Sequence, residues 1–287
     1  MLKSKKKVLL IGGDSRLSKV FKKKYNKKYL ISSTTRKNKK AKYFLDLNNV
    51  KKFKCTNKFD FVVFVGGAVS YDICENEYNY AKKINCINIP YLAKSFLEKK
   101  SHVIFISTNT VFKYKKKIPN ERSITCPGFK YARLKNITEK KLLMLSNYRN
   151  KISIIRITKN LDKKTEPFHS WFKKLKIKKS IIAFKDLYFA PILYLDSAKI
   201  ISKIIDKNVS GILHMSGKKD LNYCQFARLI LKKLKLNKNY LTCTISKEIG
   251  LKLVYNHNIT ALNMKFTKEK LGIEPTHINR IINYLTK

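Results

Sequence analysis

Short apolar runs alternate with longer amphipathic segments through the first 160 residues, and this rhythm limits the possible folds more than any other feature. The runs predict buried strands at Val8–Ile11, Tyr29–Ser33, Phe61–Val65, Val103–Ser107 and Ser153–Ile157. Between them, helical periodicity marks Leu17–Tyr25, Tyr80–Leu97 and Tyr131–Leu145. Strands that alternate with helices and are joined by right-handed crossovers predict an α/β fold, a Rossmann-type doubly wound parallel sheet.

The rhythm loosens after Ile157. We expect helices at Phe168–Leu175, Ser197–Ile205, Tyr223–Leu234 and Thr276–Leu285, and a last strand at Gly211–Met215. Residues 1–160 are predicted to form the Rossmann core, and residues 186–215 to return to it. Residues 161–185 and 216–287 are predicted to form a smaller C-terminal α/β lobe.

The chain is strongly basic, with a formal net charge of 64 − 18 = +46. Such a charge is typical of proteins that bind polyanions. However, the lysines are spread over the whole chain, only eight of the 64 cations are Arg, and no nucleic-acid-binding motif is visible. We therefore predict solvated lysines and no specific nucleic-acid partner. A polyanion-binding protein remains an alternative, with steep salt dependence as its signature.

We predict that the chain contains no membrane span, no metal site and no disulfide. The apolar runs are too short to cross a bilayer, so we expect no transmembrane segment and a cytoplasmic protein. Met1–Lys7 is interpreted as a basic leader before the first strand. Six scattered cysteines form no CxxC pair and have no His cluster beside them, and the five His residues lack metal-ligand spacing. We predict reduced, mostly structural thiols.

The loop after the first strand reads Gly12-Gly-Asp-Ser-Arg-Leu-Ser18. It precedes a helix, and this is the place where a dinucleotide pyrophosphate binds a helix N-terminus. Ser15 and Ser18 stand where a complete glycine fingerprint has glycines. A serine hydroxyl can bond a phosphate or cap the helix, and an ordinary strand–turn–helix connection explains the segment equally well.

The end of the second strand bears on cofactor choice. NAD-preferring sites place a carboxylate near this point to hold the ribose hydroxyls. Ser32-Ser-Thr-Thr-Arg-Lys37 contains no carboxylate but offers Arg36 and Lys37. Cations here suit the 2′-phosphate of NADP, so NADP is predicted, with NAD as the alternative. In so lysine-rich a chain, a chance cation explains part of this pattern.

The strongest group of candidate residues is Thr108 at the end of a strand together with Tyr131 and Lys135, which open a helix. Tyr131 and Lys135 are four residues apart, so both project from one helical face. A nearby ammonium lowers the pKa of a tyrosine, which we expect to make Tyr131 an acid–base catalyst. Thr108 is placed to hydrogen-bond a substrate oxygen.

These segments resemble the extended short-chain dehydrogenases/reductases that act on nucleotide sugars, most closely the dTDP-4-dehydrorhamnose reductases. Ile106-Ser-Thr-Asn-Thr-Val-Phe112 is similar to the family segment I-S-T-D-Y-V-F, and Tyr131-Ala-Arg-Leu-Lys135 with Glu139 to Y-G-x-x-K-x-x-x-E. Further matches cover nearly the whole chain: Val65–Asp72 with Cys74 and Glu75, Ile84-Asn85, Pro191–Asp196, Gly211–Gly217, Phe226–Arg228 and Leu271–Pro275.

The resemblance implies a role for each matching residue. Thr108 would donate to the substrate oxygen, Tyr131 would donate the proton, and Lys135 would lower the tyrosine pKa and bind the nicotinamide ribose. Asn109 would help to hold the substrate. The cofactor would contact Gly12, Gly13, Ser15, Arg16 and Leu17 at the pyrophosphate, Asp46 and Leu47 at the adenine, and Gly66, Gly67 and Ala68 beneath it.

The chain departs from the family pattern at several positions. Asn109 replaces an acid, and Lys159 stands where an aromatic residue would contact the sugar nucleotide, which implies a different substrate. Thr108-Asn109-Thr110 also lacks the Thr-Asp-Glu of the nucleotide-sugar dehydratases, so we do not expect that reaction.

The resemblance implies NADPH-dependent reduction of a keto group on a nucleotide-linked deoxysugar, within surface polysaccharide synthesis. One alternative is a nucleotide-sugar epimerase that keeps NAD tightly bound. Another is a non-catalytic NADP-binding regulatory protein, which the serine-substituted loop suggests. Whether the protein acts as a homodimer is left open.

Overall fold

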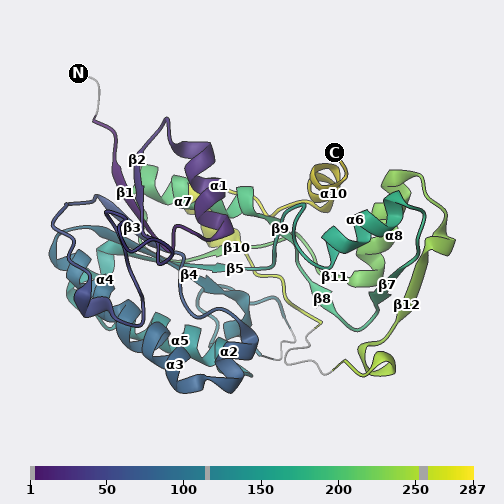
Figure 1. The fold of residues 1–287 in the computed structure, drawn as a ribbon, viewed down its shortest axis with the longest axis horizontal. Coiled ribbons are helices and arrows are strands. Elements are labelled where there is room, and N and C mark those ends of the chain that lie inside the picture. The colour runs from purple at the N-terminus through teal and green to yellow at the C-terminus, as the bar shows by residue number, and fades with distance from the viewer. Residues whose placement is uncertain (1–3, 114–116, 252–257) are drawn as a thin grey trace.

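The computed structural model describes residues 4–113, 117–251 and 258–287. Its centre is a six-stranded sheet with the strand order β10-β5-β4-β3-β1-β2, in which all neighbours are parallel (Figure 1). The strands are β1 (Lys7–Ile11), β2 (Leu30–Ser33), β3 (Phe61–Phe64), β4 (His102–Thr108), β5 (Ile152–Ile157) and β10 (Gly211–Met215). The predicted Rossmann-type α/β fold is confirmed.

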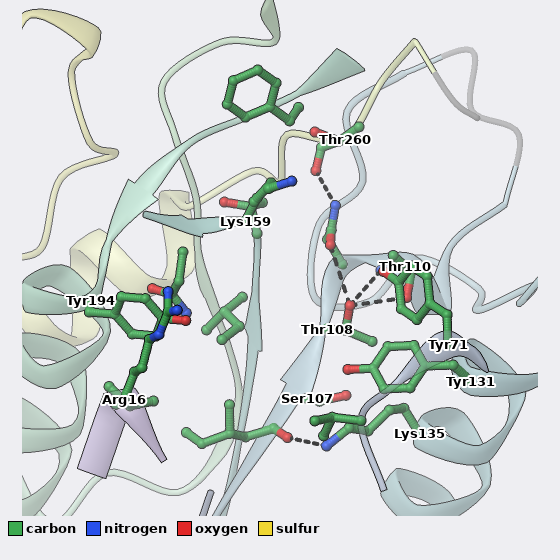
Figure 2. Close-up of a pocket in the computed structure, with 18 of the residues that line it drawn as sticks. Arg16, Tyr71, Ser107, Thr108, Thr110, Tyr131, Lys135, Lys159, Tyr194 and Thr260 are labelled. Carbon is green, nitrogen blue, oxygen red and sulfur yellow. Dashed lines mark hydrogen bonds between the residues drawn. The ribbon is translucent and has the colours of Figure 1, made fainter. Parts of the chain in front are cut away.

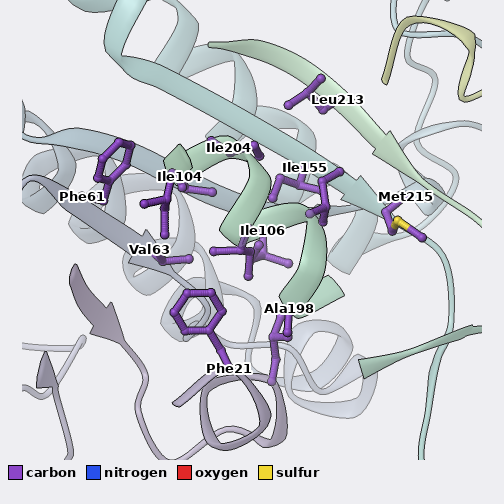
Figure 3. Packing of buried hydrophobic residues seen from close by; sticks show 14 of the residues in the cluster. Phe21, Phe61, Val63, Ile104, Ile106, Ile155, Ala198, Ile204, Leu213 and Met215 are labelled. Carbon is purple, nitrogen blue, oxygen red and sulfur yellow. The ribbon is translucent and has the colours of Figure 1, made fainter. Parts of the chain in front are cut away.

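One face of the sheet packs against α1 (Arg16–Tyr25), α7 (Tyr194–Lys207) and α9 (Lys265–Leu271). Successive strand side chains point to opposite faces, so Val8 and Leu10 of β1 reach this layer. There they share a core with Phe21 of α1 and the isoleucines of α7 (Figure 3). This layer fixes α1 against the sheet and sets the position of its N-terminus at the sheet's carboxyl edge.

The opposite face packs against a second layer of helices, which receives Leu9 and Ile11 of β1. This layer contains α2 (Tyr71–Asn76), α3 (Tyr78–Lys82), a π-helical segment η2 (Lys83–Asn88), α4 (Ile89–Glu98) and α5 (Lys130–Leu143). The single helix predicted over Tyr80–Leu97 is therefore divided into α3, η2 and α4. Pro90 in the first turn of α4 explains the division, because proline has no N–H to continue the α-helical ladder.

A second lobe stands beside the sheet (Figure 1). It contains α6 (Phe168–Lys176), α8 (Tyr223–Leu234) and α10 (Ile278–Thr286) around a core that includes Phe168, Trp171 and Phe226. Three two-stranded pairs complete it and join it to the core: β6 (Asn160–Leu161) with β9 (Ile192–Leu193), β7 (Ile181–Phe184) with β12 (Leu241–Thr244), and β8 (Tyr188–Phe189) with β11 (Leu221–Asn222).

The prediction that Gly211–Met215 is the last strand is wrong, because β11 and β12 follow it. Both are short, and β12 is half polar (Leu-Thr-Cys-Thr), so neither produces an apolar run. Short 3₁₀ turns occupy Val50–Lys52, Asn109–Val111, Ser146–Lys151, Lys238–Tyr240 and Ser246–Ile249.

The prediction that the thiols are reduced is wrong for one pair: Cys224 of α8 and Cys243 of β12 form a disulfide. The two residues are 19 positions apart in sequence, which matches no motif, but the packing of α8 on β12 brings their Cα atoms to 5.8 Å. Cys55, Cys74 and Cys86 are buried free thiols, and Cys126 is an exposed one. In the described part of the chain, no helix has the length and apolar character needed to cross a membrane.

Candidate active site

A cavity of about 890 Å³ opens at the carboxyl ends of β4 and β5, between the sheet and the second lobe. Ligands of open parallel sheets bind at this edge. The N-terminus of α1 lines one side of the cavity, α5 lines another, and Tyr223 and Phe189 reach it from the second lobe. Of the predicted site residues, the cavity collects Ser15, Arg16, Leu17, Thr108, Asn109, Tyr131 and Lys135.

The predicted catalytic residues Thr108, Tyr131 and Lys135 lie together on one wall (Figure 2). Thr108 ends β4, and its hydroxyl caps the following turn by accepting from the backbone N–H of Thr110 at 3.2 Å. Tyr131 and Lys135 are one turn apart on α5, as their spacing predicts. The strand end and the helix thus present a hydroxyl, a phenol and an ammonium to one space.

The electrostatics of this group differ from the prediction. Burial raises the pKa of Tyr131 above its ordinary value, and Tyr71 and Cys74 add to the rise while the contact with Thr108 opposes it. The ammonium of Lys135 donates to the carbonyl of Ile106 at 2.8 Å. Burial lowers the pKa of Lys135 to about 8, against the opposing charge of Glu139. Tyr131 is therefore protonated at neutral pH, which suits a proton donor.

A buried ion pair supports this wall from behind. Arg156 of β5 donates to Glu139 of α5 through Nη2 at 2.7 Å and through Nε at 3.1 Å. Glu139 also accepts from the hydroxyl of Ser107, the residue before Thr108. Both charged side chains are almost fully buried. The pair ties α5 to the two strands whose ends carry the site.

The loop that contains Ser15 and Ser18 is stabilised by hydrogen bonds between its own residues. Gly12 has a φ of +89°, and a Cβ at this position would lie 2.5 Å from the Cα of Gly66. The Ser15 hydroxyl caps α1 by accepting from the N–H of Ser18 at 3.1 Å. The Ser18 hydroxyl, which is buried, donates to the carbonyl of Gly12 at 2.9 Å. Both serine hydroxyls are thus used in capping and bracing the turn, and the helix N-terminus remains directed at the cavity.

The loop after β3 is fixed by Asn85, a buried residue that the family resemblance marked but to which we assigned no role. Its amide accepts from the N–H of Ala68 at 3.1 Å and donates to the Ala68 carbonyl at 2.9 Å. This pair of hydrogen bonds holds the segment with Gly66 and Gly67 against η2. Gly66, Gly67 and Ala68 lie beside the cavity, because Val65 and Val69 on either side of them line its wall.

The remaining predicted cofactor residues lie outside the cavity lining. Arg36 and Lys37 are exposed just after β2. Sequence reasoning found no carboxylate there, but the fold brings Asp14 to this place, where it accepts from the Thr35 hydroxyl at 2.8 Å. Leu47 is partly buried between two apolar clusters, next to Asp46.

Sequence reasoning missed most of the cavity residues that come from distant segments. Asn109 does reach the cavity, but its amide donates to the carbonyl of Thr260 at 2.8 Å and so ties β4 to the segment before α9. The lining that was not predicted includes Tyr71, Thr110, Thr158, Asn160, Tyr188, Phe189, Tyr194, Tyr223 and Thr260. A single sequence carries no signal that brings these residues to one place.

The residues that line the cavity suit the pyrophosphate and the nicotinamide ribose of a dinucleotide. The backbone N–H groups in the first turn of a helix have no intrahelical partner, and Arg16 and Leu17 occupy that turn of α1 at the cavity wall. Lys135 lies at the other end of the same space. The described residues contain no group of three or more His, Cys, Asp or Glu side chains placed to hold a metal ion.

Comparison with known families adds to this geometry. The family model of the RmlD substrate binding domain matches residues 6–285. The chain belongs to this family. The resemblance inferred from the sequence is confirmed, and the family agrees with the predicted class of enzyme, an NAD(P)-dependent oxidoreductase of the short-chain dehydrogenase/reductase type. No curated protein sequence matches the chain.

Solved structures share the whole fold at low sequence identity. A dTDP-4-dehydrorhamnose reductase from Bacillus anthracis in complex with NADP has a TM-score of 0.82 and 18% identity, covering 97% of this chain and 98% of its own. The dTDP-4-dehydrorhamnose reductase from Yersinia enterocolitica has a TM-score of 0.78 and 18% identity, with 98% and 99% covered. A UDP-N-acetylglucosamine 4-epimerase from Methanobrevibacter ruminantium has a TM-score of 0.76 and 12% identity, with 98% and 96% covered.

Proposed function

We propose that this protein reduces a keto group on a nucleotide-linked deoxysugar with NADPH, in the manner of the dTDP-4-dehydrorhamnose reductases, and serves surface polysaccharide synthesis. The observation that carries the proposal is a single cavity. It joins the N-terminus of α1 to Thr108, Tyr131 and Lys135. The similarity to a reductase crystallised with NADP supports the cofactor.

When bound, the cofactor would supply hydride to the keto carbon. The protein's side chains would bind the carbonyl oxygen, donate the proton and hold the cofactor. The Thr108 hydroxyl would donate to the carbonyl oxygen and hold it in place. Tyr131 would give its proton to that oxygen as negative charge develops there. Its raised pKa means that the phenol carries its proton at neutral pH, so the proton is present when charge develops on the substrate oxygen. Lys135 would bind the nicotinamide ribose and provide positive charge near the phenolate that remains.

The deciding experiment measures NADPH oxidation with a panel of 4-keto nucleotide sugars. We expect the wild type to oxidise NADPH with at least one of them. Tyr131→Phe should lose about two orders of magnitude or more in kcat while cofactor binding is retained, since it removes the general acid and little else. A Tyr131→Phe variant that keeps full activity would overturn the assignment of the proton donor.

Two alternatives give different results in the same experiment. An epimerase would be purified with NAD bound and would interconvert sugar nucleotides without net NADPH oxidation. A regulatory protein would bind NADPH saturably and turn over none of the sugars. The presence of Thr108, Tyr131 and Lys135 in one cavity favours an enzyme over the regulatory protein, because a binding protein has no need of a proton donor, and bound NAD in the purified protein would favour the epimerase.

A further inference from the structure

The described residues that line the cavity make it basic. None of them is Asp or Glu, whereas three are cations, Arg16, Lys135 and Lys159. Arg16 forms an ion pair with Asp162, with 3.2 Å between Nη1 and Oδ1. Lys135 is buried beside Glu139 and donates to a backbone carbonyl. Neither Lys135 nor Lys159 forms an ion pair with a carboxylate of the described residues, and of the two Lys159 is the one that is partly exposed to the cavity.

Lys159 is held in a defined place rather than left free in solvent. It follows β5 at the entry to the second lobe, and its Nζ donates to the hydroxyl of Tyr223 at 2.6 Å. The same Nζ lies 5.3 Å from the ring centroid of Tyr223 and 5.9 Å from that of Phe168. Figure 2 shows the side chain across the cavity from Thr108 and Tyr131. The two rings and the tyrosine hydroxyl hold this half-buried ammonium in place, and an ammonium has three N–H donors, so donors remain for the oxygens of a ligand.

The neighbouring groups also favour a ligand with negatively charged oxygens. The Tyr223 hydroxyl accepts from Lys159, so its own proton remains available for donation, and Tyr223 lines the cavity. Thr158 lines the cavity next to Lys159 and is 3% exposed. Its hydroxyl has no hydrogen-bond partner within the described part of the chain. A ligand oxygen, or a water that it orders, would satisfy such a group.

The sheet register places these donors near the reacting carbonyl. Thr108 pairs with Ile157 across β4 and β5, and Lys159 follows two residues later. With the usual strand spacing and rise, the backbones of Thr108 and Lys159 are roughly 8 Å apart. Both side chains line the same cavity, so one substrate can contact Thr108 through its carbonyl and Lys159 through a charged group.

We propose that Lys159 and Tyr223 form an oxyanion-binding subsite that holds a charged group of the substrate in the same cavity as the reacting carbonyl. The inference rests on the proposed function, because it takes a nucleotide-linked sugar as the substrate. Two parts of such a substrate carry this chemistry: a carboxylate on the sugar itself, or the diphosphate that joins the sugar to the nucleoside.

The test measures binding rather than turnover, so it does not depend on finding the reducible sugar. Affinities for UDP-glucose, UDP-glucuronic acid and UDP are measured by calorimetry in the presence of NADP⁺. The two sugar nucleotides differ in a single carboxylate. Trp171, the chain's one tryptophan, has its ring centroid 6.2 Å from that of Tyr223, so its fluorescence provides a second readout. The variants are Lys159→Met, which removes the charge, Lys159→Arg, which keeps it, and Lys179→Met, an exposed control on the same lobe.

We expect Lys159→Met to weaken binding roughly tenfold or more, the usual effect of losing a hydrogen bond to a charged group. A loss confined to UDP-glucuronic acid identifies the sugar carboxylate as the ligand. An equal loss for all three ligands identifies the diphosphate. Lys159→Arg should retain most of the affinity, and Lys179→Met should bind like the wild type.

The result that overturns the inference alone is a Lys159→Met protein that binds all three ligands as tightly as the wild type. A loss of the same size in Lys179→Met would also overturn it, because the effect would then be one of net charge. A wild type that binds neither these nucleotides nor dTDP-glucose would contradict the proposed substrate class, and the inference would fall with it.

Discussion

Glu139 and Arg156 form a doubly hydrogen-bonded ion pair in the interior of the core, with 2.7 Å between Arg156 Nη2 and Glu139 Oε2. The pair links α5, which carries Tyr131 and Lys135, to β5, and Glu139 extends the link to β4 through Ser107. The geometry of the candidate site therefore depends on two charges that do not line the cavity.

Glu139→Gln should be strongly destabilising, because it leaves the Arg156 guanidinium buried without a countercharge. Breaking a buried pair in this way costs about 3–5 kcal/mol. Denaturant unfolding measures the loss. The double variant Glu139→Gln with Arg156→Leu removes the unpaired charge and should recover most of the stability. If the single variant loses less than about 1 kcal/mol, the pair is not the support that its geometry indicates.

Lys135 should make the stability of the protein depend on pH above neutrality. Its pKa is about 8 in the folded chain, compared with an ordinary value of 10.5. Between these two values the unfolded chain holds a proton at this position that the folded chain has released. The contribution of Lys135 to the free energy of unfolding is therefore lowest below pH 8. It rises with pH between the two pKa values, by at most about 1.4 kcal/mol per pH unit.

The measurement compares the wild type with Lys135→Met in denaturant unfolding from pH 7.5 to 9.5. The comparison cancels the titration of the other lysines. We expect the wild type to gain stability relative to the variant as the pH rises. A difference that is constant over this range would show that the folded-state pKa of Lys135 is close to its ordinary value.

The sheet, and the wall of the cavity that holds Thr108, Tyr131 and Lys135, could be predicted from the sequence because their signals are local. β3 is a continuous apolar run and the other core strands each contain a shorter one, while Tyr131 and Lys135 share a helix face by their spacing alone. Thr108 joins them because strand ends and helix starts meet at the carboxyl edge of a parallel sheet. The family matches then extended this interpretation over nearly the whole chain.

The parts that were missed depend on packing between distant segments. The pKa of Tyr131 is raised rather than lowered because burial beside α2 and Phe129 outweighs the effect of Lys135, which donates to a carbonyl instead. Tyr223 enters the cavity from a helix about 90 positions later in the chain than Tyr131. The π-helical turn and the two-residue strands are too short to impose a period on the sequence.

The disulfide between Cys224 and Cys243 should be visible in a thiol count. Six cysteines less the bonded pair leave four free thiols, so the unfolded, unreduced protein should titrate four, and six after reduction. For a loop of this length, reduction should cost about 3 kcal/mol of stability. Cys243→Ser should show the same loss without reductant. Six thiols before reduction would mean that the two cysteines are not bonded under those conditions.

Cofactor preference should depend on the balance between Arg36 and Asp14 around the end of β2. Arg36 and Lys37 are exposed there. The carboxylate of Asp14 lies close by, because it accepts a hydrogen bond from Thr35, the residue before Arg36. The cations attract the 2′-phosphate of NADPH and the carboxylate repels it, whereas the carboxylate can accept a hydrogen bond from the 2′-hydroxyl of NADH. Arg36→Ala with Lys37→Ala should therefore raise the Kd for NADPH by roughly three- to tenfold and leave that for NADH almost unchanged.

Asp14→Asn is the matched variant, and it should act in the opposite direction. Removing the carboxylate should tighten NADPH binding and weaken NADH binding, each by a few-fold at this exposed position. Fluorescence titration of both cofactors with all three proteins gives the comparison. If Arg36→Ala with Lys37→Ala weakens NADPH and NADH binding equally, these cations act through the general positive charge of the chain. The choice between the two cofactors would then have to come from other residues.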